Sequence, residues 1–369
     1  MTSVTVTALD GIVVADFSRV LAGPYATMML GDLGAQVHKV ERPGVGDDTR
    51  RWGPPYAENG QSTYFQSINR NKDCLALDLH SDTGVTQARE LIRRSDVVIE
   101  NFKTGTMARL GLDYDTLAVD QPQLVYCSIT GFGAKEGRDL PGYDLLVQAM
   151  GGLMSITGSA PGAPTKVGVA LVDVLTGLHA TVGILAALRH RDATGQGQYV
   201  EVNLLSSLLS GLVNQASSVV GAGVVPGILG NGHPSIAPYA VYTAADGPIV
   251  LAVGNDTQFQ ALMTELGVPG MSADSRFATN PARVAHREEL TSVLNVQLAT
   301  ATALQWQERL QARGVPCGPI NSIDQAMELA SQLGLEPAID IAGVATVANP
   351  IGLSKTPVTY RLAPPALPD

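Results

Sequence analysis

The chain has 369 residues, of which 45% are hydrophobic and 16% charged, a composition typical of a globular protein with room for about two domains. Its formal net charge of −10 argues against a nucleic-acid-binding surface, which needs clustered Lys and Arg. The cysteines form no CxxC pair, so neither a disulfide framework nor a zinc site is predicted, and a reducing, cytoplasmic location is expected.

The N-terminal segment MTSVTVTALDG lacks the basic and apolar parts of a signal peptide. After it, short apolar runs alternate with helical patterns. Strands are predicted at 11–17, 36–42, 74–79, 96–102 and 124–133, and helices at 25–35, 84–95 and 114–121. Strands that alternate with helices imply parallel βαβ units, so the predicted fold class is α/β with a doubly wound sheet.

Two long helices, about Val174–Arg191 and Val202–Val220, are predicted on either side of the turn DATGQGQ. The apolar segments around them, 167–188 and 204–225, are each about long enough to span a bilayer. Charged or polar residues in both segments are costly at membrane depth. We therefore expect no membrane span, but helices buried in a soluble core or a subunit interface.

Beyond Gly221 the chain becomes rich in Gly and Pro. A hairpin is predicted at 240–254, with Asp246 and Gly247 at its tip, and helices follow at 256–267, 282–299 and 302–314. These elements predict a second domain over residues 225–325. The tail at 343–362 is predicted to form strand pieces joined by turns.

Asp173 is the only carboxylate in the apolar stretch KVGVALVDVLTGLHATVGILAAL. Because an ionised carboxylate away from water needs a partner, Asp173 either caps a helix that begins at Val174 or performs chemistry. The two interpretations are compatible, since a helix N-terminus stabilises a carboxylate and offers N–H donors to a developing oxyanion.

A dinucleotide-binding site is disfavoured. Glu41 ends the second predicted strand, where dinucleotide enzymes place an acid for the ribose. However, the loop DFSRVLAGPYATMM lacks the GxGxxG spacing that brings backbone to a pyrophosphate, and the next residue, Arg42, suits a phosphate better.

Seven segments occur in a distinctive order: VADFSRVLAGPYATMMLGDLGAQVHKVERPGVGDDTR, RNKDCLALDL, VVIENFKTGTMARLGL, YCSITGFG, PGYDLLVQAMGGLMSITG, VGVALVDVLTGLHATVGILAAL and TGQGQYVEVNLLSSLLSG. Together they resemble the class III CoA-transferases, the family that includes formyl-CoA transferase and α-methylacyl-CoA racemase. The resemblance implies a Rossmann-like large domain, formed by residues 1–224 and 326–369 with long linker helices, and an inserted smaller α/β domain at 225–325. It also implies an interlocked homodimer.

The resemblance implies that Asp173 is a nucleophile that forms an anhydride with a donor acyl-CoA and then an aspartyl-CoA thioester. The substrates would be acyl-CoA and small carboxylic acids, with no tightly bound cofactor and no metal. Tyr143 occupies the position where the racemases carry a histidine base, and a phenol is a poor base near pH 7. A racemase or isomerase is thus disfavoured, and a non-catalytic CoA-binding protein remains a third possibility.

The resemblance places further contacts along the chain. The residues expected to bind CoA are Val20, Leu21, Ala22, Arg42, Leu77, Asp78, Leu79, Asn101, Phe102, Arg109 and Tyr143. The loop LGNGHPSIAPY, with Gly230, Gly232 and His233, is expected to cover the acyl end, where His233 could orient an acceptor carboxylate. The segments NLLSS, HPSIAPY, VGNDTQF and GVPCGPIN resemble the succinyl-CoA:dicarboxylate branch. Arg19 and Arg50 are candidates to hold the distal carboxylate of such a substrate.

Overall fold

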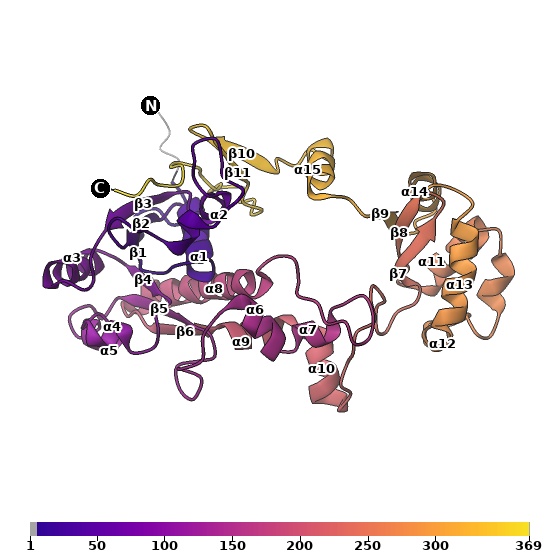
Figure 1. Cartoon of the computed structure of the whole chain (residues 1–369), viewed down its shortest axis with the longest axis horizontal. Helices are drawn as coiled ribbons and strands as arrows, with labels where there is room; N and C mark the ends of the chain where they lie inside the picture. Colours follow the sequence, from indigo (N-terminus) through magenta and orange to yellow (C-terminus); the bar gives the residue numbers. More distant parts are fainter. Residues whose placement is uncertain (1–5, 369) are drawn as a thin grey trace. The chain divides into compact units, whose positions relative to one another are not determined.

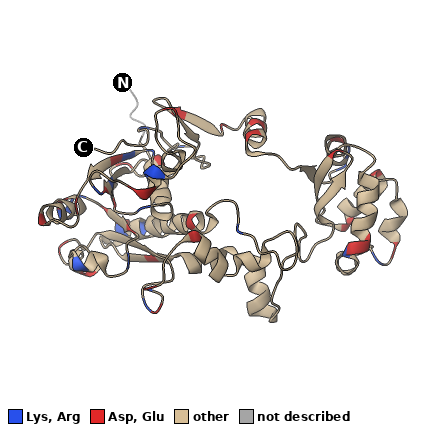
Figure 2. Ribbon diagram, viewed as in Figure 1, with Lys and Arg blue, Asp and Glu red and all other residues tan. Residues whose placement is uncertain are grey.

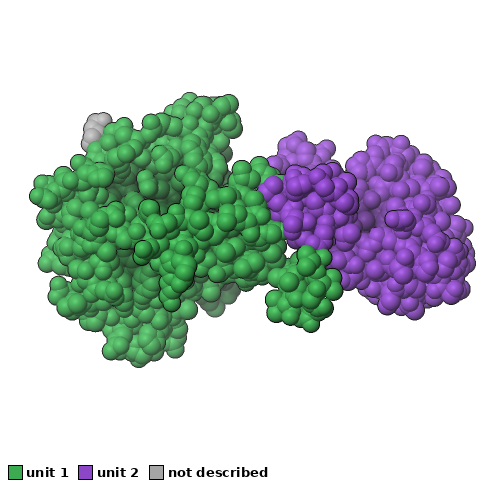
Figure 3. Space-filling model, turned by 60° about the horizontal axis from the view of Figure 1, so that its bottom comes forward, with its two compact units in different colours: residues 1–153, 166–225, 336–369 green, residues 154–165, 226–335 purple. Residues whose placement is uncertain are grey.

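A computed structural model describes residues 6–368 of the chain (Figure 1). Residues 1–5, part of the segment in which no signal peptide is expected, and residue 369 lie outside the described residues. The chain divides into two compact units (Figure 3). Unit 1 comprises 1–153, 166–225 and 336–369, and unit 2 comprises 154–165 and 226–335. Relative to the predicted division, 154–165 and the last ten residues before 336 belong to unit 2.

Unit 1 is built around a parallel six-stranded sheet in the order β3-β2-β1-β4-β5-β6. Its strands are β1 (Val13–Asp16), β2 (Gln36–Glu41), β3 (Lys72–Ala76), β4 (Val97–Glu100), β5 (Val125–Thr130) and β6 (Tyr199–Asn203). This is the strand order of a doubly wound Rossmann-like sheet, and the predicted α/β class is confirmed for this unit. Strands β1, β4 and β5 are buried along nearly their whole length because helices cover both of their faces.

The helices of unit 1 form two layers. Its helical segments are α1 (Ala22–Asp32), η1 (Asp48–Arg51), α2 (Thr63–Ile68), α3 (Asp82–Arg93), α4 (Thr106–Arg109), α5 (Tyr114–Leu117), α6 (Asp144–Met150), α7 (Leu153–Ile156), α8 (Leu171–Thr194), α9 (Leu204–Gly211) and α10 (Val213–Ala222). Helix α7 straddles the boundary between the units. On one face, buried residues of α3, α4 and α5 pack on Ala15, Phe17 and Val98 of the sheet. On the other, α8 packs against α1, β5 and β6.

The C-terminal chain returns to unit 1 as the antiparallel pair β10 (Ala338–Ile341) and β11 (Val344–Val347). Arg70, only 2% exposed, joins this segment to the sheet. Its guanidinium pairs with Asp32 at 2.6 Å and donates a 2.8 Å hydrogen bond to the carbonyl of Val347. Asp32 also accepts a hydrogen bond from Asn349 at 2.9 Å. The segments around Asp32 and Arg70 and the C-terminal segment at Val347 and Asn349 therefore meet at one buried ionic centre.

Unit 2 contains the antiparallel sheet β7-β8-β9, with β7 (Tyr239–Ala244), β8 (Gly247–Ala252) and β9 (Cys317–Pro319). Its helical segments are α11 (Asp256–Glu265), η2 (Pro269–Ala273), α12 (Asn280–Ala285), α13 (Arg287–Leu298), α14 (Ala303–Gln311) and α15 (Ile323–Gln332). The predicted hairpin is confirmed. The single helix predicted at 282–299 is wrong, because the chain leaves helical geometry at His286 between α12 and α13.

The helix predicted at Val202–Val220 is also wrong. The chain first forms β6, whose Tyr199 pairs with Tyr126 at the edge of the sheet. Asn203 then caps α9 by accepting a hydrogen bond from the backbone N–H of Ser206 at 2.8 Å. Helices α9 and α10 meet at a bend of 85° next to Val213, whose φ is +41°.

Helix α8 is long and apolar enough to cross a bilayer by length and composition, and α9 with α10 could count as one bent segment. Within the chain, 44% of the most apolar window of α8 is buried. Figure 2 shows α9 and α10 without a charged residue. Exposed valines, Val182 of α8 at 65% and Val220 of α10 at 88%, form part of an apolar surface on unit 1.

The three cysteines are free thiols. Burial, together with the nearby Glu41 carboxylate, raises the pKa of Cys74 to about 12, and burial raises the pKa of Cys317 to about 11. Burial also raises the pKa of Cys127, which lies within β5. All three thiols therefore stay protonated at neutral pH.

Candidate active site

A cavity of about 1130 Å³ lies in unit 1 at the carboxyl ends of the parallel strands. Its walls come from the loops after β1, β4 and β5, from η1, and from the first turns of α6 and α8. Strands β1 and β4 are neighbours in the sheet, and the strand order reverses between them. In open α/β sheets, this switch point is where ligands bind.

Asp173 lines this cavity from the first turn of α8. The helix begins at Leu171 with Ala170 as its N-cap, so the expectation that Asp173 caps a helix starting at Val174 is wrong. Within residues 6–368, no hydrogen-bond donor or cation is paired with its carboxylate. Burial, helped by the nearby Asp144 carboxylate, raises the pKa of Asp173 to about 7. Such desolvated, perturbed groups concentrate at functional sites.

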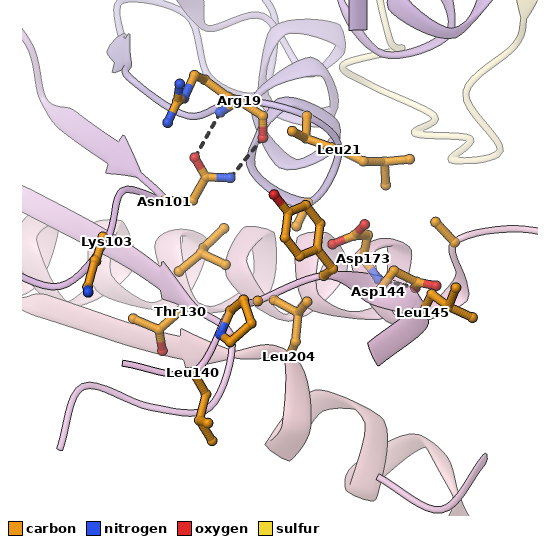
Figure 4. A pocket seen from close by; sticks show the side chains of 18 of the residues that line it. Arg19, Leu21, Asn101, Lys103, Thr130, Leu140, Asp144, Leu145, Asp173 and Leu204 are labelled. Atoms are coloured by element: carbon orange, nitrogen blue, oxygen red, sulfur yellow. Dashed lines mark hydrogen bonds between the residues drawn. The ribbon is translucent and has the colours of Figure 1, made fainter. Parts of the chain in front are cut away.

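Asp144 is the residue that caps α8. Its Oδ1 accepts hydrogen bonds from the backbone N–H groups of Val172 at 2.8 Å and Asp173 at 3.3 Å. Its Oδ2 accepts a hydrogen bond from the side-chain amide of Gln148 at 2.6 Å, and Oε1 of Gln148 accepts one from the backbone N–H of Val167 at 2.9 Å. Figure 4 shows Asp144 and Asp173 side by side. This role is not apparent in the sequence, since Asp144 precedes α8 by more than twenty residues.

The capping by Asp144 corrects a second expectation. The N-terminus of α8 was expected to offer N–H donors to an oxyanion. However, the N–H groups of Val172 and Asp173 are bound by Asp144, and that of Leu171 donates to the carbonyl of Val169. The N–H of Val174 donates to the carbonyl of Ala170. The first turn of α8 therefore positions Asp173 without leaving a donor free for a substrate.

Close backbone contacts hold these elements together. A side chain at Gly131, after β5, would place its Cβ 2.4 Å from the Cα of Gly142, directly before Tyr143 and Asp144. A Cβ at Gly177 of α8 would lie 2.6 Å from the carbonyl oxygen of Ala22 in α1. Glycine at Gly131 lets the segment before α6 approach the end of β5, and glycine at Gly177 lets α1 approach α8.

The backbone N–H groups of the loop after β1 donate to side chains of the protein. That of Ser18 donates to Asp16 at 2.9 Å, that of Arg19 to Asn101 at 2.9 Å, and that of Val20 to Asp47 at 3.2 Å. A pyrophosphate would need these donors free. This loop is therefore unlike a dinucleotide-binding turn, in agreement with the missing glycine pattern.

Arg50 is not available to a substrate, so its candidacy for the distal carboxylate is wrong. Its Nε and Nη2 each donate to Glu41 at 2.7 Å, and its guanidinium stacks 3.8 Å from the ring centroid of Phe65. This bidentate pair also occupies Glu41, the acid that a ribose would have needed. The neighbouring Arg51 is exposed and lines the cavity.

Eight of the predicted site residues line the cavity: Arg19, Val20, Leu21, Ala22, Asn101, Phe102, Tyr143 and Asp173. Arg19 packs over the ring of Phe102, 5.1 Å from its centroid, and its side chain points away from Asp173 in Figure 4. Tyr143 is 67% exposed. The structure thus brings these eight residues together around one cavity.

Five residues predicted to bind CoA lie outside the lining of this cavity: Arg42, Leu77, Asp78, Leu79 and Arg109. Four of them follow strands β2 and β3 directly and so share the carboxyl edge of the sheet with the cavity. Leu77 lines a second groove, against α3, and Leu79 packs on the buried core. Arg42 and Arg109 are exposed cations, as a phosphate contact requires.

The predicted acyl-end loop belongs to unit 2. Its backbone is fixed at His233, whose N–H donates to Tyr239 at 3.0 Å and whose Nδ1 accepts from Ser235 at 3.1 Å. Gly230 has a φ of +57°, and a Cβ at Gly232 would meet the Arg287 guanidinium at 2.9 Å. Their part in the site stays a prediction.

Two aromatic residues of the cavity were missed by the sequence analysis. Tyr64 of α2 and Trp52 meet edge to face with centroids 5.2 Å apart. Burial raises the pKa of Tyr64 to about 12, with smaller contributions from Asp173 and Asp144, so its phenol stays neutral. The signal for α2 was weak, because the helix covers only Thr63–Ile68.

The fold and the site define an α/β protein whose cavity at the strand switch point contains a desolvated carboxylate. The family model described as CoA-transferase family III matches residues 9–368. The chain therefore belongs to CoA-transferase family III and is an enzyme of that class, acting on CoA thioesters.

A succinate–glutarate CoA-transferase of Agrobacterium fabrum is 44% identical, with coverage of 97% of this chain and 92% of the relative. An acetyl-CoA:oxalate CoA-transferase of Acetobacter aceti is 38% identical, with 94% and 89% covered. Among solved structures, a CAIB/BAIF family protein from Brucella suis superposes with a TM-score of 0.88 at 41% identity, with 98% of this chain and 96% of that chain covered. These similarities support CoA transfer between acids.

Proposed function

We propose that this enzyme moves CoA from succinyl-CoA to a small dicarboxylic acid, with Asp173 as the nucleophile. The observation that carries the proposal is the Asp173 carboxylate, which lines the cavity and has a pKa raised to about 7 by burial and by Asp144. A carboxylate without hydrogen bonds keeps its lone pairs free for attack on a thioester. The names of the relatives support the acids exchanged.

In the first half-reaction, Asp173 attacks the thioester carbonyl carbon of succinyl-CoA. The C–S bond breaks, CoA departs as the thiolate, and a mixed anhydride between the aspartyl and succinyl groups forms. The thiolate then attacks the aspartyl carbonyl, which releases succinate and forms an aspartyl-CoA thioester. Two moderate barriers replace one high barrier.

In the second half-reaction, the acceptor carboxylate attacks the aspartyl-CoA thioester and expels CoA thiolate, giving a new anhydride. The thiolate attacks the acceptor carbonyl and forms the product acyl-CoA, while Asp173 regains its carboxylate. The exposed Arg51 at the cavity wall, whose guanidinium has no hydrogen-bond or ion-pair partner among the described residues, is a candidate to hold the acceptor's distal carboxylate.

Oxygen labelling tests this route. With glutarate labelled with ¹⁸O, the bridging oxygen of the second anhydride stays on Asp173 and then leaves with succinate in the next cycle. We expect ¹⁸O in the Asp173 peptide and in succinate by mass spectrometry, and no labelling of an Asp173→Asn protein. Transfer without labelling of Asp173 would contradict the mechanism. CoA binding with no transfer to any acid of a dicarboxylate panel would contradict the function.

The pH dependence of the reaction should follow the ionisation of Asp173. Attack needs the carboxylate, so kcat/KM should rise with pH through about 7 and level off above it. Asp144→Asn keeps an oxygen for the cap but removes the charge that helps to raise the pKa of Asp173. We expect the midpoint of kcat/KM against pH to move to lower pH in this variant.

Asp48→Asn is the matched control, because Asp48 lines the same cavity but is not among the groups that raise the pKa of Asp173. Its midpoint should stay with that of the wild-type enzyme. An unmoved midpoint in Asp144→Asn would show that Asp144 does not disfavour ionisation of Asp173.

We also propose that the enzyme is a homodimer, interlocked as the resemblance implies. The uncharged helices α9 and α10 and the exposed Val182 and Val220 present apolar surface that a monomer rarely leaves in water. Analytical ultracentrifugation should give twice the mass of the chain, and a monomer at micromolar concentration would contradict the proposal.

A further inference from the structure

Val20, in the wall of the cavity, has a backbone conformation that valine rarely adopts. Its φ of +69° lies in the left-handed region, where a β-branched side chain is a genuine outlier. Such conformations persist only where surrounding contacts determine them, and they concentrate at functional sites. Val20 lies between Arg19 and Leu21, which also line the cavity.

Side chains from two distant segments hold this loop. Asp47, directly before η1, accepts hydrogen bonds from the N–H of Val20 at 3.2 and 3.4 Å. Asn101, directly after β4, accepts from the N–H of Arg19 at 2.9 Å and donates to its carbonyl oxygen at 2.8 Å. Figure 4 shows both bonds between Asn101 and Arg19. The backbone on both sides of the Arg19–Val20 peptide is thus fixed.

Asp47 is itself held in a buried ionic pair. The Lys39 ammonium lies 2.9 Å from Asp47 Oδ2, and neither side chain is exposed. Lys39 also donates to the carbonyl of Ser18 at 3.0 Å, and Thr49 donates to Asp47 through its N–H and its hydroxyl. Burial, the largest single effect, would raise the pKa of Asp47, but the charge of Lys39 and the hydrogen bonds from Lys39 and Thr49 together hold that pKa below its usual range. The loop therefore rests on a charge pair that stays ionised.

We propose that Asp47 is a positioning residue that, with Asn101, holds Val20 in the left-handed conformation and so shapes the wall against which acyl-CoA binds. This inference rests on the proposed function. With the N–H groups of residues 18–20 and the carbonyls of Ser18 and Arg19 bound internally, the wall presents the side chains of Val20 and Leu21. That apolar surface fits the methylene groups of the pantetheine arm better than a phosphate.

A double-mutant cycle tests the inference. Asp47→Asn removes the charge that pairs with Lys39, and Val20→Gly removes the steric penalty of a positive φ. In the valine background, we expect Asp47→Asn to weaken CoA binding by about tenfold, as released strain lets the loop leave its binding conformation. In the Val20→Gly background, the same substitution should weaken binding by less than about threefold. Isothermal titration calorimetry with CoA gives all four dissociation constants.

A role limited to folding would give a different pattern. Asp47→Asn would then lower the melting temperature equally in both backgrounds and leave the dissociation constant unchanged in the folded fraction. Equal weakening of CoA binding in both backgrounds would also overturn the inference. If Asp47→Asn does not fold, Asn101→Ala with and without Val20→Gly makes the same comparison, with the same outcomes decisive. A wild-type protein that does not bind CoA would instead overturn the proposed function.

Discussion

Replacing Asp173 with asparagine is expected to reduce CoA transfer by at least about a thousandfold. The amide has nearly the same shape as the carboxyl group, but it cannot form the anhydride or return as a leaving carboxylate. Turnover of succinyl-CoA with glutarate, followed by mass spectrometry, measures the loss. Full activity in this variant would contradict the proposed mechanism.

The same substitution should stabilise the folded protein above neutral pH. In the folded state, the pKa of Asp173 is raised from 3.8 to about 7, so the folded chain holds this proton more tightly than the unfolded chain. Stability of the wild-type protein is consequently lost as pH rises from about 4 through 7, by up to about 4 kcal/mol. Asp173→Asn avoids this loss.

Melting temperatures of the two proteins should therefore agree near pH 4 and separate above pH 7, with the variant higher. This comparison is also the folding control for the activity test. If the inactive variant melts lower than wild type at pH 8, misfolding would explain its inactivity. Asp173→Glu, measured at pH 8, would then be the second variant, because it provides a carboxylate at a shifted position. A stable, inactive Asp173→Asn protein is the result that supports nucleophilic attack.

Replacing Arg70 with alanine is expected to lower the stability of unit 1 by about 3–5 kcal/mol, the range for breaking a buried ion pair from one side. Arg70 is 2% exposed, and its removal leaves Asp32 without its only cationic partner among the described residues. It also removes the hydrogen bond to Val347 that anchors β11. The C-terminal segment should detach before the sheet unfolds.

The two tryptophans make the measurement specific to one unit. Trp52 belongs to unit 1 and Trp306 to unit 2, so in a Trp306→Phe background the fluorescence reports on unit 1 alone. Urea unfolding of this protein with and without Arg70→Ala gives the difference in free energy. Exposed Arg94 provides the matched control, and Arg94→Ala should change the free energy of unfolding by less than about 0.5 kcal/mol. Equal midpoints for Arg70→Ala and Arg94→Ala would contradict the prediction.

Most of the central sheet could be predicted from the sequence. Strands β1, β4 and β5 are mainly apolar runs, as expected of buried parallel strands. Strand β2 was also predicted, although it contains Gln36, His38 and Lys39. Strand β6 was missed because its last residues were assigned to the helix predicted from Val202, although Asn203 caps α9 and marks the boundary between the two elements. Helix α15 was missed although its signal was present, since Ser322 and Gln325 form a capping box.

The site shows where sequence reasoning reaches its limit. Asp173 is conspicuous in the sequence because it is a lone carboxylate in an apolar stretch. The cap from Asp144 is a tertiary contact, and no local pattern announces it. Arg50 and Arg51 are neighbours in the sequence, yet only the fold shows that Arg50 is bound to Glu41 while Arg51 faces the cavity.

The state of the three cysteines matters for how this enzyme can be assayed. With pKa values raised by burial, to about 12 for Cys74 and about 11 for Cys317, the protein's own thiols react slowly with disulfide-exchange dyes at pH 7 to 8. A dye of this kind would then colour only with CoA that has escaped from the enzyme. The rate at which the absorbance of the dye rises therefore measures hydrolysis of the aspartyl-CoA thioester, in which water replaces the acceptor acid.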